Sequence, residues 1–233
     1  FNSVAAANPY AMFDEAMTAA EIGEASSSNR IMGDPHLKSM VAKDGVNQAS
    51  ALVLTSWETA QSLGVADRAI FLQGHGTGSE PQVLNRRAIG ESEAMAAAYR
   101  NALAGAGIDA EQIGAADLYS CFPIAVWVAM DALGITLDDP RPLTLTGGLP
   151  FFGGPGNNYS THGIAEMVHW LRAQPEPAYG VVGANGGYLS KHAVGVYANM
   201  PAEFPEAVPE FKAPEVVEVV SDPEPDGVIE SYT

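Results

Sequence analysis

Three segments of the sequence combine side chains that could do chemistry with glycines that could bring a ligand close to the backbone. They read "DLYSCFP" (117–123), "GGLPFFGGPGNNYSTHG" (147–163) and "GANGGYLSKHAVG" (183–195). The first holds the one cysteine of the sequence, the second has six glycines, and the third places a histidine shortly after a glycine pair. A thiol, a cradle of backbone amides and an imidazole are the groups that these segments could supply.

The first segment places Cys121 at the end of an expected strand (116–122), directly before an expected helix (124–134). The amides at a helix N-terminus could activate such a thiol, and Tyr119 and Ser120 add hydroxyl groups beside it. The alternative is a buried thiol that behaves as a small apolar side chain. The residues alone leave both interpretations open.

The second segment is a glycine-rich loop between an expected strand (142–148) and an expected helix (160–174). This is the position at which α/β sheets place ligands. Glycine permits positive φ and close backbone approach, and the amides that open a helix can hold an anion or an oxyanion. The loop matches neither the Walker A pattern nor GxGxxG. A tight packing loop without a ligand is the alternative.

The third segment is expected to turn at Asn185, Gly186 and Gly187, which could aim backbone amides at a ligand. His192 follows on an expected strand and is a candidate base. A histidine on a strand can equally be a core residue whose hydrogen bonds are satisfied.

Two further patterns are weaker. His162 and Glu166 form an HxxxE pair on the expected helix, but a third metal ligand is missing, so no metal site is expected. "HGTGSE" (75–80) is expected to be a loop that could cradle a phosphate, although the acid that ends it opposes this.

Composition and charge limit the classes of function that the sequence allows. The 233 residues are 47% hydrophobic, and 28 acids against 11 Lys and Arg give a formal net charge of -17. This charge disfavours nucleic acid and anionic membranes as partners, and a phosphate-bearing ligand would need a local basic patch. A single cysteine excludes a disulfide framework and favours a reduced, cytoplasmic setting. The chain lacks an apolar run of about 18 residues, so no membrane span is expected.

The elements that must position these groups alternate between strands and helices, which predicts an α/β fold with a mixed sheet. Strands are expected at 49–56, 68–74, 116–122, 142–148, 179–187 and 191–199, and helices at 14–25, 57–64, 91–107, 124–134 and 160–174. The strand at 49–56 should be buried on both faces, the helix at 124–134 should lie inside, and the last two strands should form an antiparallel pair.

Taken together, the three segments resemble the C-terminal half of a thiolase of the sterol carrier protein X type, and more closely the thiolase-like protein type 1 branch. The resemblance covers 44–200. It implies a layered α-β-α fold with a five-stranded mixed sheet and helices on both faces. It also implies a division into a remnant of the N-terminal half (1–66), the C-terminal half (67–200) and an acidic, proline-rich linker to a further module (201–233). Because the sequence begins at Phe1, we expect a fragment or a processed product.

The resemblance carries over residue by residue. "LYSCF" stands at the family's His-Asp-Cys-Phe motif, which implies an acid/base role for Cys121 and places Tyr119 where a His or Asn orders a water of the oxyanion hole. "GGLPFFGGPG" stands at the Gly-His-Pro motif, where Gly154 replaces the catalytic histidine. "ANGGYLSKH" stands at the last glycine-rich loop, where Asn185 and Gly186 match but the second cysteine of classical thiolases is missing.

The implied function is a thiolase-type acyltransferase that acts on acyl-CoA thioesters, with coenzyme A as a substrate rather than a tightly bound cofactor. The expected catalytic residues are Cys121, Tyr119, His192 and Tyr188. The expected substrate-binding residues are Gly153, Gly154, Asn157, Asn158, His162, Asn185, Gly186 and Gly187. The family's nucleophile lies in the N-terminal half, so a complementing half or a homo-oligomer is an expected partner.

Two other functions stay open. One is retro-aldol carbon–carbon cleavage of a β-hydroxyacyl-CoA, with Tyr119 or Tyr188 as the proton carrier. The other is a non-catalytic scaffold that binds acyl-CoA. The missing family histidine opposes ordinary thiolase chemistry, because one oxyanion-hole donor typically lowers the barrier by about 3–4 kcal/mol.

Overall fold

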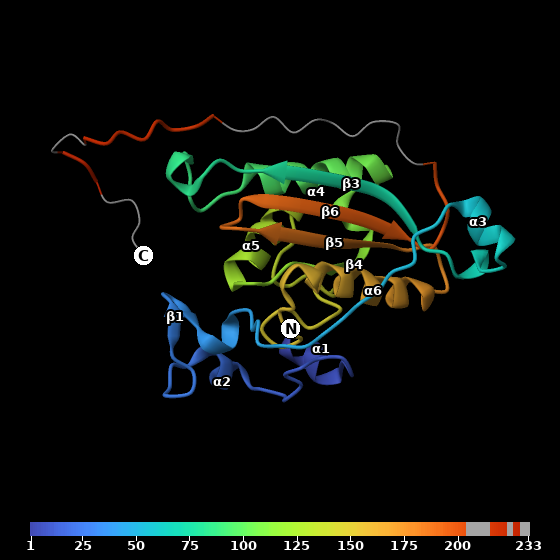
Figure 1. The fold of residues 1–233 in the computed structure, drawn as a ribbon, viewed down its shortest axis with the longest axis horizontal. Helices are drawn as coiled ribbons and strands as arrows, with labels where there is room; N and C mark the ends of the chain where they lie inside the picture. Colours follow the sequence, from blue (N-terminus) through green and yellow to red (C-terminus); the bar gives the residue numbers. More distant parts are fainter. Residues whose placement is uncertain (204–214, 223–225, 229–233) are drawn as a thin grey trace.

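The computed structural model describes residues 1–203, 215–222 and 226–228 (Figure 1). The helices are α1 (Asn2–Ala7), α2 (Ala19–Gly23), α3 (Trp57–Ser62), α4 (Glu93–Ala106), α5 (Pro123–Leu133) and α6 (Tyr159–Arg172). The strands are β1 (Ile31–Gly33), β2 (His36–Leu37), β3 (Phe71–Ser79), β4 (Ile113–Asp117), β5 (Tyr179–Gly186) and β6 (Lys191–Ala198). Short 3₁₀ turns lie at Lys38–Met40, Ala66–Arg68, Val83–Asn85, Ala110–Gln112 and Gly156–Asn158.

The main sheet has the strand order β3-β6-β5-β4, with an antiparallel β3–β6 pair, an antiparallel β6–β5 pair and a parallel β5–β4 pair. Helices cover both faces, with α6 in front of the sheet and α4 behind it (Figure 1). Val181 and its neighbour Val182 belong to separate apolar clusters, one shared with α4 and α5 and the other with α6. The layered α-β-α arrangement with a mixed sheet is therefore as predicted.

Local sequence signals correctly predicted several helices and one strand pair. α4 and α5 end directly before Gly107 and Gly134, and α3 ends two residues before Gly64. All three glycines have positive φ, a conformation that closes a helix with little strain in the absence of a Cβ atom. The predicted antiparallel pair of β5 and β6 is present. The helix predicted over 14–25 is shorter, since only Ala19–Gly23 is helical, behind a capping box formed by Thr18 and Glu21.

Within the part of the chain that the structure describes, the main sheet has four strands rather than five, because the predicted strand at 142–148 forms no regular ladder. Its carbonyl groups do lie against β4, since the amides of Ala116 and Leu118 donate to Pro142 and Leu143. The amides of Leu145 and Thr146, however, donate to the carboxylate of Asp117. A side chain thus takes the hydrogen bonds that a neighbouring strand would otherwise make.

The prediction of a buried strand at 49–56 is wrong. This segment has no regular secondary structure, and Val53 and Leu54 are 94% and 91% exposed. An apolar run of this length predicts a buried strand, but it is buried only where another segment packs against it. Among the described residues, no strand lies next to it.

The prediction of a loop over "HGTGS" is also wrong, because these residues continue β3 to Ser79. Gly74, Gly76 and Gly78 occupy alternate positions facing α4, and a Cβ atom on any of them would overlap the backbone of that helix. The carbonyl groups in question belong to Ala102, Ala98 and Ala94, one per helical turn. These glycines therefore allow close packing of a helix on a strand, and they form no phosphate-binding nest.

One strand boundary and the burial of one helix around the first motif also differ from the prediction. β4 ends at Asp117 rather than 122, so Leu118–Phe122 forms the turn into α5. α5 does not lie wholly inside. Its Val126 and Met130 are buried against the sheet side, but Trp127 is 57% exposed on the outer face.

The domain boundaries predicted for the chain stay predictions. In the acidic C-terminal segment the described residues include Val217, whose amide donates to the carbonyl of Asn85, and Glu215, which pairs with Arg87. Most of that segment lies outside the described residues.

The glycine seam of β3 gives a test of the fold. We expect Gly76→Val to lower the free energy of unfolding by about 3 kcal/mol or more, because the side chain must push α4 away from the sheet. Gly90→Val is the matched control, since no atom lies within 4 Å of a Cβ there. Urea denaturation measures both variants, and equal stability would contradict the packing described.

Candidate functional site

The turn between β4 and α5 carries Cys121, and it lies beside the end of β5. The Cys121 thiol donates to Oδ1 of Asn185 over 3.8 Å. The Cys121 carbonyl accepts the amide of Ala42 at 2.9 Å. The thiol is therefore fixed between a strand of the main sheet and the N-terminal segment.

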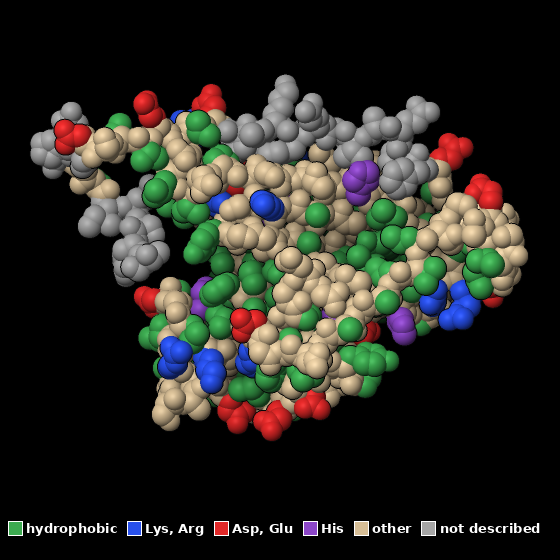
Figure 2. All heavy atoms as spheres, in the orientation of Figure 1, with side chains coloured by type: hydrophobic (Ala, Val, Ile, Leu, Met, Phe, Trp, Pro, Cys, Tyr) green, Lys and Arg blue, Asp and Glu red, His purple; other side chains and the backbone are tan. Residues whose placement is uncertain are grey.

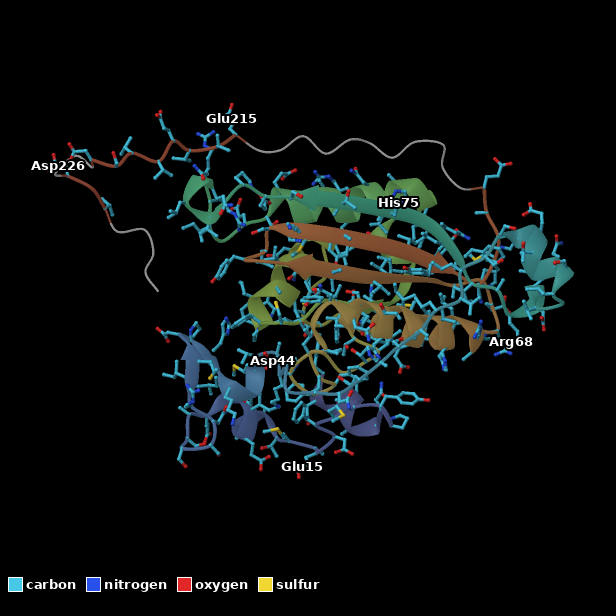
Figure 3. The ribbon with its side chains drawn as sticks, in the orientation of Figure 1. Glu15, Asp44, Arg68, His75, Glu215 and Asp226 are labelled. Atoms are coloured by element: carbon cyan, nitrogen blue, oxygen red, sulfur yellow. The ribbon has the colours of Figure 1, made fainter. Side chains whose placement is uncertain are left out.

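The glycine-rich loop is tied to the same turn by two bridges. The Ser120 hydroxyl accepts the amide of Leu149 at 3.1 Å. Lys43, which adjoins Ala42, donates its amide to the Leu149 carbonyl at 3.3 Å and accepts the amide of Gly154 at 2.8 Å. Asp44, the next residue, lies between the N-terminal segment and the sheet (Figure 3). Cys121, Gly154 and Asn185 thus meet at one end of the sheet.

A buried carboxylate, Asp117, holds this arrangement in place. Its Oδ2 atom accepts the amides of Leu145 and Thr146 at 2.8 and 3.0 Å and the hydroxyls of Thr144 and Thr146, each at 3.1 Å. Its Oδ1 atom accepts the hydroxyl of Tyr159, the first residue of α6, at 3.2 Å. One side chain therefore joins the strand before Cys121 to both ends of the glycine-rich loop.

Sequence reasoning missed Asp117, although a signal was present. A carboxylate within an apolar strand is costly to bury unless hydrogen bonds satisfy it. Burial raises the pKa of Asp117, and the donors from Thr146, Leu145 and Thr144 oppose that shift. An aspartate directly before a chemistry-bearing turn therefore indicates a buried hub.

The Cys121 thiol is not activated. Burial raises its pKa, and the backbone amides of Phe122 and Cys121 and the side chain of Asn185 only partly oppose this shift. Cys121 is therefore a neutral thiol near pH 7, which makes it a better proton donor than nucleophile.

Tyr119 lies beside this thiol with its ring half-buried. Its ring meets the ring of Tyr159 edge-on, with 5.4 Å between the centroids. Burial raises the pKa of Tyr119, and the thiolate that Cys121 forms at high pH raises it to a smaller degree, so the phenol also keeps its proton near pH 7. The turn therefore presents two protonated groups.

The other predicted site residues, among them Tyr188, a predicted catalytic residue, are more dispersed. His162 packs its ring against Phe152 at 5.2 Å and contacts Nδ2 of Asn158 through Nε2 at 3.3 Å, and burial lowers its pKa. Asn157 and Tyr188 are exposed, the latter by 83%. Gly153 and Gly187 adopt positive φ within their turns.

His192 is buried, with 4% of the residue exposed. Its Nε2 atom lies 3.1 Å from Oγ of Ser92 and 3.1 Å from the carbonyl of Leu189. It is the direct cross-strand partner of Asn185, which connects it to the Cys121 turn. The roles predicted for all these residues stay predictions.

Two of the cavities formed by the described residues lie outside this turn. The larger, of about 570 Å³, is formed by the N-terminal segment, and its lining includes Lys38 and Lys43. The smaller, of about 440 Å³, lies between α1 and α6. Lys43 belongs both to the larger cavity and to the bridge described above, so this cavity adjoins the chemical groups without containing them.

Neither a metal cluster nor a membrane helix is found within the described ranges. No three His, Cys, Asp or Glu side chains gather there in a way that could hold a metal ion. Glu166 of the HxxxE pair instead accepts Nδ2 of Asn8 at 3.3 Å. Of the helices in the same ranges, none has the length and apolar character that a membrane crossing requires.

Comparison with known proteins finds similarity to solved structures. No family model and no curated protein matches this chain. The chain is similar to the crystal structure of a monomeric SCP2-thiolase like protein type 1 from Mycobacterium smegmatis, with 47% identity and a TM-score of 0.82. The match covers 87% of this chain but 45% of that chain, so the sequence spans less than half of that protein's length.

The hub role of Asp117 predicts a large effect on stability. We expect Asp117→Asn to lower the free energy of unfolding by about 3 kcal/mol, because an amide cannot accept all of the hydrogen bonds that the buried carboxylate accepts. Asp131→Asn, on the exposed side of α5, is the control. Thermal and urea denaturation measure both variants, and a stable Asp117→Asn protein would refute the role of this hub.

The neutral thiol predicts a shifted pH profile of alkylation. Because burial raises the pKa of Cys121, we expect its rate of reaction with iodoacetamide to rise with a midpoint above that of the same cysteine in the protein unfolded in urea. The single cysteine makes the readout specific. A midpoint below that of the unfolded protein would show an activated thiolate and contradict the assignment.

Proposed function

We propose, from the premise that this chain is a thiolase-like protein of the SCP2 type, that it forms part of an acyl-CoA site at which Cys121 transfers a proton. The reaction class is acyl transfer between acyl-CoA thioesters. The observation that carries this proposal is the meeting of the Cys121 thiol with Asn185 at 3.8 Å, beside the loop of Gly154.

The proposed chemistry follows from the protonation of the two groups in the turn. Reactions at the α-carbon of a thioester pass through an enolate, which needs hydrogen-bond donors at its oxygen and a proton donor or acceptor at its carbon. A neutral thiol at Cys121 is suited to give a proton to that carbon, and the Tyr119 phenol is suited to donate to the oxygen.

Gly154 contributes no donor in place of the family's histidine. It has no side chain, and its amide already donates to the Lys43 carbonyl at 2.8 Å. The oxyanion donors must therefore come from other groups, which gives Tyr119 a larger role than its position in the family's motif implies.

Two lysines next to the site support a CoA thioester as the ligand. Lys38 and Lys43 line the 570 Å³ cavity together with Glu21 and Glu24. Lys and Arg side chains lie over the segment that holds α2 and β1, with acidic side chains nearby (Figure 2). Burial, and to a smaller degree the charge of Lys38, lower the pKa of Lys43. In a chain with a net charge of -17, these lysines are where the phosphates of CoA would be attracted.

Retro-aldol cleavage of a β-hydroxyacyl-CoA is the second candidate. It is favoured by the same protonated thiol and phenol, because this reaction needs proton transfer and no acyl-cysteine. A base removes the proton of the β-hydroxyl, the Cα–Cβ bond breaks to give a carbonyl product and a thioester enolate, and the enolate takes a proton to form the shorter acyl-CoA.

The two reactions are separated by their products. We expect Cys121→Ala to lower kcat by at least about 100-fold in whichever reaction the protein catalyses, because proton transfer by a positioned group contributes a factor of that order. Chromatography distinguishes a lengthened acyl chain plus free CoA from a carbonyl product plus a shorter acyl-CoA.

The control for this experiment is Ser62→Ala, which changes a hydroxyl on α3 outside the site. Calorimetric titration with acetyl-CoA should show binding by the wild type and by Cys121→Ala alike. If the full chain shows neither binding at millimolar ligand nor turnover of either substrate class, the proposed function is wrong.

A further inference from the structure

His192 belongs to a buried hydrogen-bond network whose geometry defines which ring nitrogen carries the proton. The hydroxyl of Ser92 lies 2.8 Å from Oε1 of Glu80, which also accepts the amide of Ala94 at 2.8 Å. Because Ser92 donates its one hydroxyl proton to this carboxylate, its oxygen must accept from His192. The Leu189 carbonyl, 3.1 Å from the same ring atom, can only accept. Nε2 of His192 therefore carries the proton.

The second ring nitrogen of His192, Nδ1, is then a hydrogen-bond acceptor without a donor. Nδ1 is buried and has no hydrogen-bond partner in the structure. His192 as a residue is only 4% exposed, and burial lowers its pKa against the opposing effects of the Leu189 carbonyl and Glu80. The charge of Arg86 lowers the pKa further. The imidazole is therefore neutral near pH 7, with a free lone pair on Nδ1.

Asn185 carries a hydrogen-bond donor, Nδ2, that also has no partner. Its Oδ1 accepts the Cys121 thiol, which leaves Nδ2 as a buried donor without a partner. Asn185 and His192 are direct partners in the antiparallel β5–β6 ladder, so their side chains leave the sheet on the same side, with Cβ atoms about 5 Å apart. An unpaired donor and an unpaired acceptor thus belong to directly paired residues of the ladder, and one of these residues, Asn185, also accepts the thiol.

We propose that Asn185 Nδ2 and His192 Nδ1 bind one hydroxyl oxygen between them. Such an oxygen must accept a hydrogen bond from the amide and donate one to the imidazole. A hydroxyl does both, whereas a carbonyl oxygen cannot donate and an ammonium group cannot accept. Buried polar atoms without partners are costly in a native protein, so two adjacent ones indicate an occupant that satisfies both.

The occupant is a water molecule or the hydroxyl of a substrate. The second case rests on the proposed function. The substrate is then a β-hydroxyacyl thioester whose hydroxyl donates to Nδ1 of His192 while its α-carbon faces Cys121. His192 is then the group that takes the hydroxyl proton in the cleavage described above. Glu80, Ser92 and Leu189 act through His192 by fixing its tautomer.

Two variants separate the two nitrogens of the ring. His192→Gln keeps a polar group near the position of Nε2, toward Ser92 and Leu189, but removes the acceptor at Nδ1. His192→Asn keeps an acceptor near the position of Nδ1 but gives up the contacts of Nε2. A purely structural role makes His192→Gln the milder change, whereas the proposed site makes it the more damaging one for ligand discrimination.

The first measurement compares 3-hydroxybutyryl-CoA with butyryl-CoA by calorimetry on the full chain. We expect the wild type to bind the hydroxy ester at least about tenfold more tightly, because the plain ester leaves both buried atoms unpaired. This ratio should fall to about one in His192→Gln and survive in His192→Asn. A ratio that is unchanged in His192→Gln would overturn the assignment to the substrate hydroxyl.

The second measurement is made without any ligand, so that it does not depend on the proposed function. In ¹⁵N-histidine-labelled wild-type protein, we expect the His192 signals of a neutral ring that is protonated on Nε2, with Nδ1 shifted by an accepted hydrogen bond. If the ring shows these signals but the two esters bind equally, or neither binds, the oxygen between Asn185 and His192 belongs to a water molecule. A proton on Nδ1, or a Nδ1 signal without a hydrogen bond in both the free and ligand-treated protein, would refute the site altogether.

Discussion

The arrangement of the site depends on one buried interaction, the carboxylate of Asp117. Its oxygens accept the amides of Leu145 and Thr146, two threonine hydroxyls and the hydroxyl of Tyr159. These donors belong to the segment before the glycine-rich loop and to the helix after it, while Asp117 itself ends the strand that leads to Cys121. A loop so rich in glycine has high conformational entropy, which must be offset for the loop to hold one position. The hub provides that constraint at both of the loop's ends.

A second constraint sets the other side of the site. Gly74, Gly76 and Gly78 let α4 approach β3 until the helix backbone fills the space of the missing Cβ atoms. This close packing brings Ser92, the N-cap of α4, within 3.1 Å of the His192 ring on β6. The glycines thus act indirectly on the chemistry, because they decide how deeply the imidazole is buried and which partners it meets.

Features that depend on residues close together in the sequence were predicted from residue types, and the resemblance to thiolases predicted the layered α/β fold. The helix ends at Gly107 and Gly134 and the β5–β6 pair followed from residue types alone. Features that depend on distant partners were missed or misjudged. The strand-forming residues at 49–56 have no described strand beside them, and the glycines of β3 resembled a loop because their partner is a helix backbone rather than a side chain. Asp117 was missed although a carboxylate within an apolar strand is a signal, and the tautomer of His192 could not be predicted, since its partner Ser92 lies 100 residues away in the sequence.

The account as a whole depends on three bends meeting at one end of the sheet around the thiol. A nitroxide label on Cys121, the single cysteine, tests this directly by paramagnetic broadening of amide signals. The account predicts that the amides of Gly154 and Gly186 broaden strongly, while that of Gly64, after α3 at the opposite end of the sheet, stays sharp (Figure 1). Sharp signals from both Gly154 and Gly186 in the labelled protein would contradict it.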